Sequence, residues 1–321
     1  MKKSYLMMAA AATMLAACTQ TDLVQEVNTQ QAISFEAFAG KTTRTEIANL
    51  TKLQEVGFKV WGYAIPDDDT YDPLTPFSGA TVTYNNGKWG YTGEKQEWKP
   101  GYEYTFGAIA PAAATNAAFD ATTKKYSVTG AKSGIASSSN VVDYLVATPQ
   151  TIHASNANLV TLDFGHIMSK VSVAVDGSAD VKIHKIEVKG WNDSETNSYS
   201  TDGGWSFTGD PAYADYVTLR NAETDGEGKK IYESTENATD NANSLLIVPQ
   251  DGAVLTFRFT YKVGATEFEN KEVTVTAQDL AVNQHTTYSF TVGAAIIEFS
   301  AKMETGWSTA DPQPTIPKIE N

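Results

Sequence analysis

Residues 171–175 read VSVAV, and this pattern decides the fold class of the chain. The valines stand at every second position, so in an extended strand they share one face and the small residues share the other. The same period of two recurs in LTFRF at residues 255–259 and in VTV at residues 273–275. Alternating segments rich in Val, Ile, Thr, Tyr and Phe predict half-buried antiparallel strands.

Clusters of turn-forming residues separate these segments. They are NNG at residues 85–87, PG at 100–101, DGG at 202–204 and DG at 251–252. Only residues 45–56 are compatible with a turn or two of helix. Many short strands joined by frequent turns predict an all-β protein of the sandwich or barrel type rather than an α/β fold.

The two halves of the chain resemble each other weakly. DYLVATPQ at residues 143–150 is echoed by LLIVPQ at residues 245–250, and the stretch between them at residues 153–158 is small and polar. A small polar stretch of this kind is typical of a linker. We therefore expect two β-sandwich domains, residues 33–158 and residues 159–321, the second ending in a short proline-containing tail.

The N-terminus has the order of a secretory signal. Lys2 and Lys3 precede an apolar run of 12 residues that ends in LAAC at Cys18. A run of this length is too short for a bilayer, which needs about 20 apolar residues. The ending resembles the bacterial lipobox, which predicts a lipoprotein signal over residues 1–18, a lipid on Cys18 and a flexible tether over residues 19–32. An ordinary signal with a cysteine beside its cleavage site is the alternative.

The composition limits the partners of the exported chain. Cys18 is the only cysteine, so the body has no disulfides and must be stable on its core alone. Removal of Lys2 and Lys3 with the signal leaves 22 basic residues against 38 acidic ones, a net charge of −16. A surface of this charge repels phosphate backbones, which argues against nucleic acid as a partner.

The residues that most often carry catalysis or bind metal form no known motif. The histidines are scattered over the chain, as His153, His166, His184 and His285. No metalloprotease or serine-hydrolase motif is present, and no cysteine nucleophile. A pair of carboxylates brought together only in space stays open, so a surface hydrolase is a third hypothesis. The acidic run at residues 67–69 could bind calcium but lacks the spacing of a calcium loop, and a solvated turn is the preferred interpretation. The prediction is a protein without catalytic residues, metal or cofactor.

Aromatic residues gather in one region of the first half, at Trp89, Trp98, Tyr102 and Tyr104. Such a cluster could stack on a sugar ring, which would make the chain a lipid-anchored surface glycan-binding protein. Packing across neighbouring strands is the ordinary role of such aromatics. Packing is therefore the preferred interpretation, and stacking on a sugar is the alternative.

Several short motifs follow one another in order along nearly the whole chain. The most specific is FGHIMSKVSV at residues 164–173. The others are LAAC ending at Cys18, ISF at 33–35, TR at 43–44, WKPG at 98–101, YTF at 104–106, VPQ at 248–250, YSF at 288–290 and GW at 306–307. Together they resemble the fimbrillin-like proteins of Bacteroidetes, which include the FimA and Mfa types.

This resemblance implies an architecture, a role and a set of partners. The architecture is all-β, with two transthyretin-like antiparallel β-sandwich domains in tandem. The role is that of a structural or accessory subunit of adhesive, type V-like fimbriae on the cell surface. The implied partners are other pilin subunits, the outer membrane through the lipid on Cys18, and a trypsin-like surface protease.

The resemblance also implies a cleavage. In the family, a protease cuts after an arginine near the first strand and releases the lipid and that strand together. Arg44 follows the predicted strand at residues 33–38, in which Ile33, Phe35 and Ala37 would be displaced. A solvated arginine in a loop is the alternative. A missing strand leaves an apolar trough and unpaired backbone groups, which can accept a strand from another chain.

The last predicted strand resembles the first. ISFEA at residues 33–37 and IEFSA at residues 297–301 place Ile, Phe and Ala on one face and exchange Ser and Glu on the other. This likeness suggests that residues 296–303 of a neighbouring subunit replace the released strand. The donated apolar row would be Ile297, Phe299, Ala301 and Met303.

The same stretch can also be the last strand of the second domain, with a likeness that reflects only common alternation. Only residues 308–321 follow Trp307, with prolines among them. A stalk subunit would be expected to carry a longer donor segment. The position in a fibre therefore stays open between stalk, tip and anchor.

Overall fold

The computed structural model of the chain describes residues 31–39, 50–177, 181–221, 231–233, 244–293 and 297–305. The predicted signal, Cys18 and Arg44 lie outside these residues. Strands make up most of the regular structure in the described part, which confirms the all-β prediction. Its helical elements are α1 Leu50–Val56, within the segment expected to allow a helix, and the single turn η1 Ala154–Asn156. No helix in the described part is long and apolar enough to cross a membrane.

The first half of the chain forms an eight-stranded sheet around one core. Its strands are β1 Phe35–Ala39, β2 Phe58–Pro66, β3 Leu74–Asn85, β4 Lys88–Tyr91, β5 Tyr102–Ala110, β9 Leu145–Ala147, β10 Gln150–His153 and β11 Val160–His166. The order is β1-β11-β9-β5-β2-β3-β4, with β10 paired to β5. The sheet folds over on itself, because the rings of Phe35 on β1 and Tyr91 on β4, at opposite ends of this order, lie 6.0 Å apart.

The second half packs two sheets face to face. One has the order β24-β23-β12-β18-β8, with β17 on β12, and the other the order β16-β13-β20-β21. Their strands are β8 Gly134–Ile135, β12 Ser169–Gly177, β13 Val181–Lys189, β16 Val217–Asn221, β17 Ile231–Glu233, β18 Leu245–Ile247, β20 Thr256–Val263, β21 Thr266–Thr274, β23 Gln284–Val292 and β24 Ile297–Thr305. Val173 of β12, Phe257 of β20 and Phe290 of β23 meet in one buried core, so the alternation of VSVAV does place its valines inside. The pair β19 Gln250–Ala253 and β22 Gln278–Leu280 extends this half.

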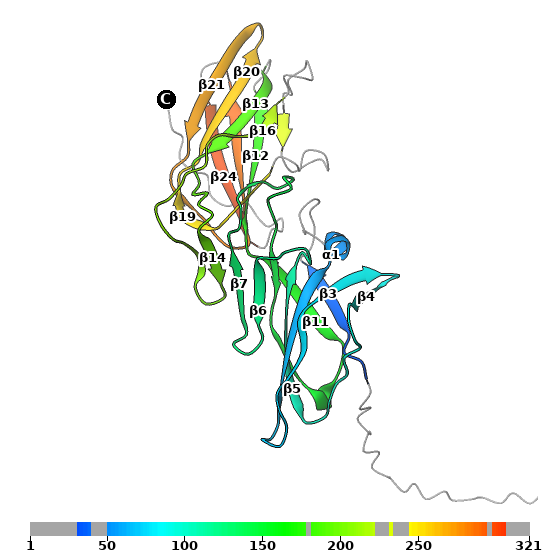
Figure 1. The fold of residues 1–321 in the computed structure, drawn as a ribbon. Helices are drawn as coiled ribbons and strands as arrows, with labels where there is room; N and C mark the ends of the chain where they lie inside the picture. Colours follow the sequence, from blue (N-terminus) through cyan, green and yellow to red (C-terminus); the bar gives the residue numbers. More distant parts are fainter. Residues whose placement is uncertain are drawn as a thin grey trace, which may run out of the picture.

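A further sheet combines strands from both halves. It has the order β15-β14-β7-β6, from β6 Ala117–Asp120, β7 Lys125–Thr129, β14 Asn197–Ser200 and β15 Gly204–Phe207. The hydroxyl of Tyr126 on β7 donates to the Ala147 carbonyl over 2.5 Å and accepts from the Ala108 amide over 3.0 Å. On the other side of this sheet, the indole Nε1 of Trp205 on β15 donates to the Ile167 carbonyl over 2.6 Å. In Figure 1 this sheet lies between the two ends of an elongated molecule.

The strand pairings show where the chain passes from the first half of the fold to the second. β11 begins after residue 158 and still lies in the first sheet, so the change from the first sheet to the second falls at residues 167–168, between β11 and β12. The division of the chain into domains at residue 158 stays a prediction. Among the described strands most pairs are antiparallel, as expected, and two are parallel: β1 with β11 and β12 with β23.

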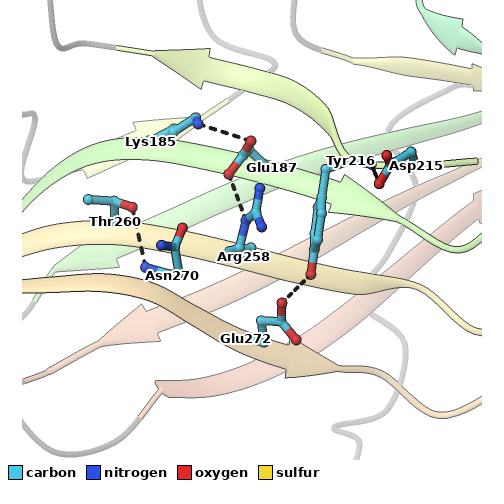
Figure 2. A network of polar contacts seen from close by, with 8 residues as sticks. All are labelled: Lys185, Glu187, Asp215, Tyr216, Arg258, Thr260, Asn270 and Glu272. Atoms are coloured by element: carbon cyan, nitrogen blue, oxygen red, sulfur yellow. Dashed lines mark hydrogen bonds and ion pairs between the residues drawn. The ribbon is translucent and has the colours of Figure 1, made fainter.

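Charged and aromatic side chains cover the outer face of the sheet β16-β13-β20-β21 (Figure 2). Glu187, Arg258 and Glu272 stand side by side on β13, β20 and β21, since their Cα atoms are partners in the strand register. The Arg258 Nε atom donates to Glu187 Oε2 over 2.7 Å, and Lys185 Nζ lies 3.1 Å from Glu187 Oε1. Glu187 is 5% exposed, so these two cations offset the cost of burying its charge.

Tyr216 ties the start of β16 to the same network. Its ring centroid lies 3.6 Å from the guanidinium carbon of Arg258, and its hydroxyl donates to Glu272 Oε1 over 2.5 Å. Burial and the Glu272 carboxylate raise the pKa of Tyr216 to about 12, so its hydroxyl stays protonated at neutral pH. The segment that leads into β16 is thereby held on the sheet.

The Glu187 carboxyl has a lowered pKa. Burial raises this pKa, but the hydrogen bonds from Arg258 and Lys185 lower it by more. A carboxyl whose pKa is lower in the folded chain stabilises the fold above its unfolded-state pKa, about 4.3 for Glu. That contribution is lost as the pH falls through the folded-state pKa.

We expect Arg258→Ala to lower the free energy of unfolding by about 1–3 kcal/mol at pH 7, because Glu187 loses a charge-assisted hydrogen bond. Urea denaturation measures the change. In a chain that carries Glu187→Gln, the same substitution should cost less, since the charge that Arg258 neutralises is gone. The cost should also shrink below the folded-state pKa of Glu187. An equal cost in both backgrounds and at both pH values would contradict this account.

Candidate functional site: the terminal strands

Residues 31–39 are paired on one side, at their start, with the segment that precedes β5. The Ile33 amide donates to the Gln96 carbonyl over 2.9 Å, and the Trp98 amide donates to the Gln31 carbonyl over 3.1 Å. Ala32 and Glu97 form an antiparallel bridge between these two bonds. Sequence reasoning missed this pairing, because the short segment around Trp98 has no alternating pattern of its own.

The remainder of the segment is paired on its other side, with β11. β1 runs parallel to β11 in a register that matches Phe35 to Val160 and Ala39 to Phe164. The Val160 amide also donates to the Ser34 carbonyl over 2.9 Å. Residues 31–39 therefore bridge two segments that have no other pairing with each other among the described strands, and removing them would leave backbone groups unpaired on both.

The apolar side chains of this segment point into the first core. Ile33 is 1% exposed, Phe35 5% and Ala37 1%. Complete burial of side chains such as Ile and Phe stabilises a fold by about 1.5–3 kcal/mol each. These residues share one buried face, as the sequence predicted. That the strand is displaced after cleavage stays a prediction.

Phe35 packs against three other aromatic rings. Its ring centroid lies 5.3 Å from that of Phe77, 5.8 Å from that of Phe106 and 6.0 Å from that of Tyr91, each in an edge-to-face arrangement. Aromatic pairs in this geometry contribute about 0.5–1.5 kcal/mol beyond the area they bury. Phe35 thus connects β1 to the strands β3, β4 and β5.

Residues 40–49 connect β1 to α1, and α1 packs against β1. Arg44 lies in this connection, outside the described residues. On the outward face of β1, Phe38 is 44% exposed, next to the start of the connection.

The last strand lies in the other half. β24 runs antiparallel to β23 in a continuous register from Ile297 opposite Val292 to Thr305 opposite Gln284. It is an edge of its sheet, so its second side has no strand partner among the described residues. In this structure the stretch is therefore the last strand of the second half, and it does not touch β1.

The four predicted donor positions differ in burial. Ala301 is 7% exposed and Ile297 is partly buried against the second core, whereas Met303 is 40% exposed. For Phe299 the structure describes the backbone, which pairs with Phe290. The apolar row of β24 is thus only partly enclosed where it lies.

The aromatic cluster of the first half forms no exposed platform. Trp98 is 2% exposed, Tyr102 6% and Tyr104 1%, and the Trp98 and Tyr104 rings pack 4.8 Å apart. Trp89 is half-buried and lies 4.9 Å from the Phe58 ring. These side chains fill the core, as cross-strand packing predicts, and a sugar cannot stack on them in this structure.

The histidines and acidic residues form no metal-binding group in the described part of the chain. There, no group of three or more His, Cys, Asp or Glu side chains is placed to hold a metal ion. His166 Nδ1 lies 2.9 Å from Asp143 Oδ1 in a buried pair, and His285 Nε2 lies 2.8 Å from Ser172 Oγ. Asp67, in the acidic run, lies 2.9 Å from His153 on the surface.

The chain matches a known family model and several solved structures. A model described as fimbrillin-like matches residues 43–307. A fimbrial protein from Bacteroides vulgatus superposes with a TM-score of 0.57 at 14% identity, covering 86% of this chain and 99% of that chain. A putative cell adhesion protein from Bacteroides ovatus gives 0.54 at 15% identity, covering 88% of this chain and 99% of that chain.

A putative cell adhesion protein from Bacteroides uniformis gives a TM-score of 0.51 at 14% identity, covering 86% of this chain and 98% of that chain. At these identities the structural likeness establishes the fold and no more. No curated protein matches the chain. Since the family model extends over most of the sequence and over both halves of the fold, the chain belongs to the fimbrillin-like family.

Proposed function

We propose that this chain is a structural or accessory subunit of adhesive cell-surface fimbriae and has no catalytic role. The observation that carries the proposal is the fimbrillin-like match over residues 43–307, together with a fold shared with a fimbrial protein and with putative cell adhesion proteins. A surface location follows from that role. The partners are further fimbrial subunits, of the same or a related kind.

Export is the first step of the proposed pathway. The positive residues, the short apolar run and the LAAC motif that ends at Cys18 support a lipoprotein signal. A lipid on Cys18 would hold the precursor in the outer membrane. Several acyl chains would be needed, since one chain binds a membrane only marginally.

Release by a trypsin-like protease at Arg44 is the second step. The connection at residues 40–49 separates β1 from α1, so a cut there would split the chain between two elements without breaking either. This placement between two elements favours the connection as the place of cleavage.

Strand exchange is the third step. Residues 31–39 supply hydrogen bonds to β11 and to the segment around Trp98, and they cover the core with Ile33, Phe35 and Ala37. Their loss would open a groove with unpaired edges on both sides and an apolar floor. A strand that presents the same apolar row could fill it.

The proposed donor is β24 of the next subunit, with Ile297, Phe299 and Ala301 in place of the lost row. Donation requires β24 to leave β23, with which it pairs along its whole length. Two features lower the cost: β24 is an edge strand, and Met303 is 40% exposed where it lies. The released pairing with β23 would be replaced by pairing with β11 of the neighbour.

Arg44→Ala is expected to abolish polymer formation, because the first strand and its lipid are never released. N-terminal sequencing of the surface form should then find the lipid-bearing start at Cys18, where the unchanged chain starts at Thr45. Gel electrophoresis without boiling should show the loss of high-mass ladders.

The matched control is Lys41→Ala, which removes another trypsin-type site from the same connection and should leave the polymers intact. Ladders of normal intensity in Arg44→Ala would show that cleavage after Arg44 is not the trigger.

Paired cysteines test which strand the donor adjoins. Ser300 holds the position in IEFSA that Glu36 holds in ISFEA, and Glu36 is the register partner of Thr161 on β11. A chain with Thr161→Cys and Ser300→Cys should form disulfides between subunits, seen as a ladder on non-reducing gels. Adjacent strands hold such pairs within disulfide range.

The comparison chain carries Ser289→Cys and Ser300→Cys, because these residues are partners when β24 stays on β23. Oxidised before assembly, it should cross-link within single subunits and then form no polymers; oxidised only after assembly, the polymers should contain no such internal cross-link. Polymers that keep the internal cross-link and form none through Thr161 would rule out β24 as the donor.

A further inference from the structure

Tyr213 is a large aromatic residue that is exposed on a rigid backbone. Its side chain is 70% exposed. Its neighbours are fixed, since the Ala214 amide donates to the Trp191 carbonyl over 2.8 Å and the Ala212 amide donates to Asn192 Oδ1 over 3.2 Å. Trp191 itself is 1% exposed in the second core. The fold therefore keeps the Tyr213 ring exposed to solvent. Packing within the fold does not explain why an aromatic residue stands at this position.

A cleft of about 650 Å³ lies beside Tyr213. It runs between β15, β19 and the residues that follow β22; β19 and β14, the hairpin partner of β15, are labelled in the middle of Figure 1. Its walls include Trp205, Asp251 and the 41%-exposed Val282. This volume is within the range of small-molecule sites, roughly 300–1,000 Å³.

The base of the cleft is tied down by hydrogen bonds. The Gln250 side chain accepts from the Asn192 amide over 2.7 Å and donates to the Asn192 carbonyl over 3.3 Å and the Val248 carbonyl over 3.0 Å. Trp205 is anchored through its indole nitrogen to the Ile167 carbonyl. The cleft is thus formed before any ligand enters, which lowers the entropic cost of binding.

Two polar groups of the residues that line the cleft can form further hydrogen bonds. Asn192 Oδ1 accepts from Ser194 and Ala212, but the Asn192 Nδ2 group has no hydrogen-bond partner among the described residues. The Asp251 carboxylate likewise has none within the described ranges, and it lies exposed in β19, at the register shift beside Gly252. The cleft therefore offers one donor and one strong acceptor beside an aromatic face.

These groups select the chemistry of the ligand. None of the described residues that line the cleft is Lys, Arg or His, so an anionic ligand would meet only the Asp251 charge. The ammonium group of a peptide lysine would suit Asp251 and the Tyr213 ring, but it has no acceptor, so a separate group of that peptide would have to reach Asn192 Nδ2. A sugar hydroxyl is both donor and acceptor, and the C–H face of a pyranose ring is apolar enough to cover Tyr213.

We propose that this cleft binds a short neutral glycan, of roughly one or two rings given its volume. The ring lies on Tyr213, and its hydroxyl groups bond to Asp251 and Asn192. The inference rests on the adhesive part of the proposed function and gives that adhesion a ligand class. Binding by a single subunit needs no fibre, so it can be tested apart from cleavage and strand exchange.

The test applies the purified chain to an array of neutral di- and trisaccharides and measures the best binder by titration calorimetry. Tyr213→Ala should weaken binding about tenfold or more, since it removes the stacking face, while Tyr213→Phe should keep most of the affinity. Asp251→Asn should also weaken binding, because a neutral amide accepts a hydrogen bond less strongly than a carboxylate.

Tyr71→Ala is the matched control. Tyr71 is 61% exposed in the connection between β2 and β3, far from the cleft in the fold, and its removal should leave binding unchanged. Equal urea midpoints for the variants would show that each is folded.

Three results would overturn the proposal. They are the absence of binding to any neutral glycan at millimolar concentration, unchanged binding in Tyr213→Ala, and binding of a lysine-rich peptide in place of a glycan. Polymers that form normally alongside any of these results would leave the proposed fimbrial role standing. Conversely, a chain that binds a glycan but forms no polymers would support the glycan site and contradict the fimbrial role.

Discussion

Backbone hydrogen bonding along residues 31–39 is the constraint on which the first half of the molecule depends. One end of this segment forms backbone hydrogen bonds with residues 96–98, and the rest forms them with β11. It therefore supplies hydrogen-bond partners to two strand edges at once. It also closes the core, because Phe35 packs against rings on β3, β4 and β5. A buried backbone group without a partner costs about 1–3 kcal/mol, so an empty place here would strongly favour any strand able to fill it. The proposed assembly uses this property and requires no chemistry beyond one peptide-bond cleavage.

Sequence patterns predicted the strands well because alternation depends only on residues close in the chain. The valines of VSVAV are buried, and Asn86 and Gly87 both have the positive φ angles, 52° and 80°, that a tight hairpin turn requires. The apolar face of the first strand was also predictable, from Ile33, Phe35 and Ala37. Which strands pair over long distances was not, because period-two segments look alike whichever neighbour they adopt. The sheet that joins β7 to β14 and the parallel pairing of β12 with β23 were missed for this reason.

The candidate sites show the same limit. Core packing was the preferred interpretation of Trp98 and Tyr104, and both are buried, but the sequence could not exclude a sugar platform because burial depends on which face the sheet turns inward. Tyr213 stood in no motif and gave no signal, because its exposure comes from contacts to Trp191 and Asn192 that only the folded chain brings together. The aromatic residues that cluster in the sequence, such as Trp98 and Tyr104, are buried in the core, whereas Tyr213, which belongs to no cluster, lines a cleft.

The sheet shared by the two halves has a mechanical consequence. β7 is tied to the first sheet through Tyr126, β14 and β15 are tied to the second half, and β7 pairs with β14. A pulling force along a fibre therefore cannot simply straighten the chain at Ile167 like a hinge. It must first break the backbone bonds between β7 and β14 and the hydrogen bond of Trp205. It would also have to break the pairing of β8 with β18 and the two hydrogen bonds between Ala131 and the Asn197 side chain. Under tension the subunit would therefore behave as one rod until these links gave way.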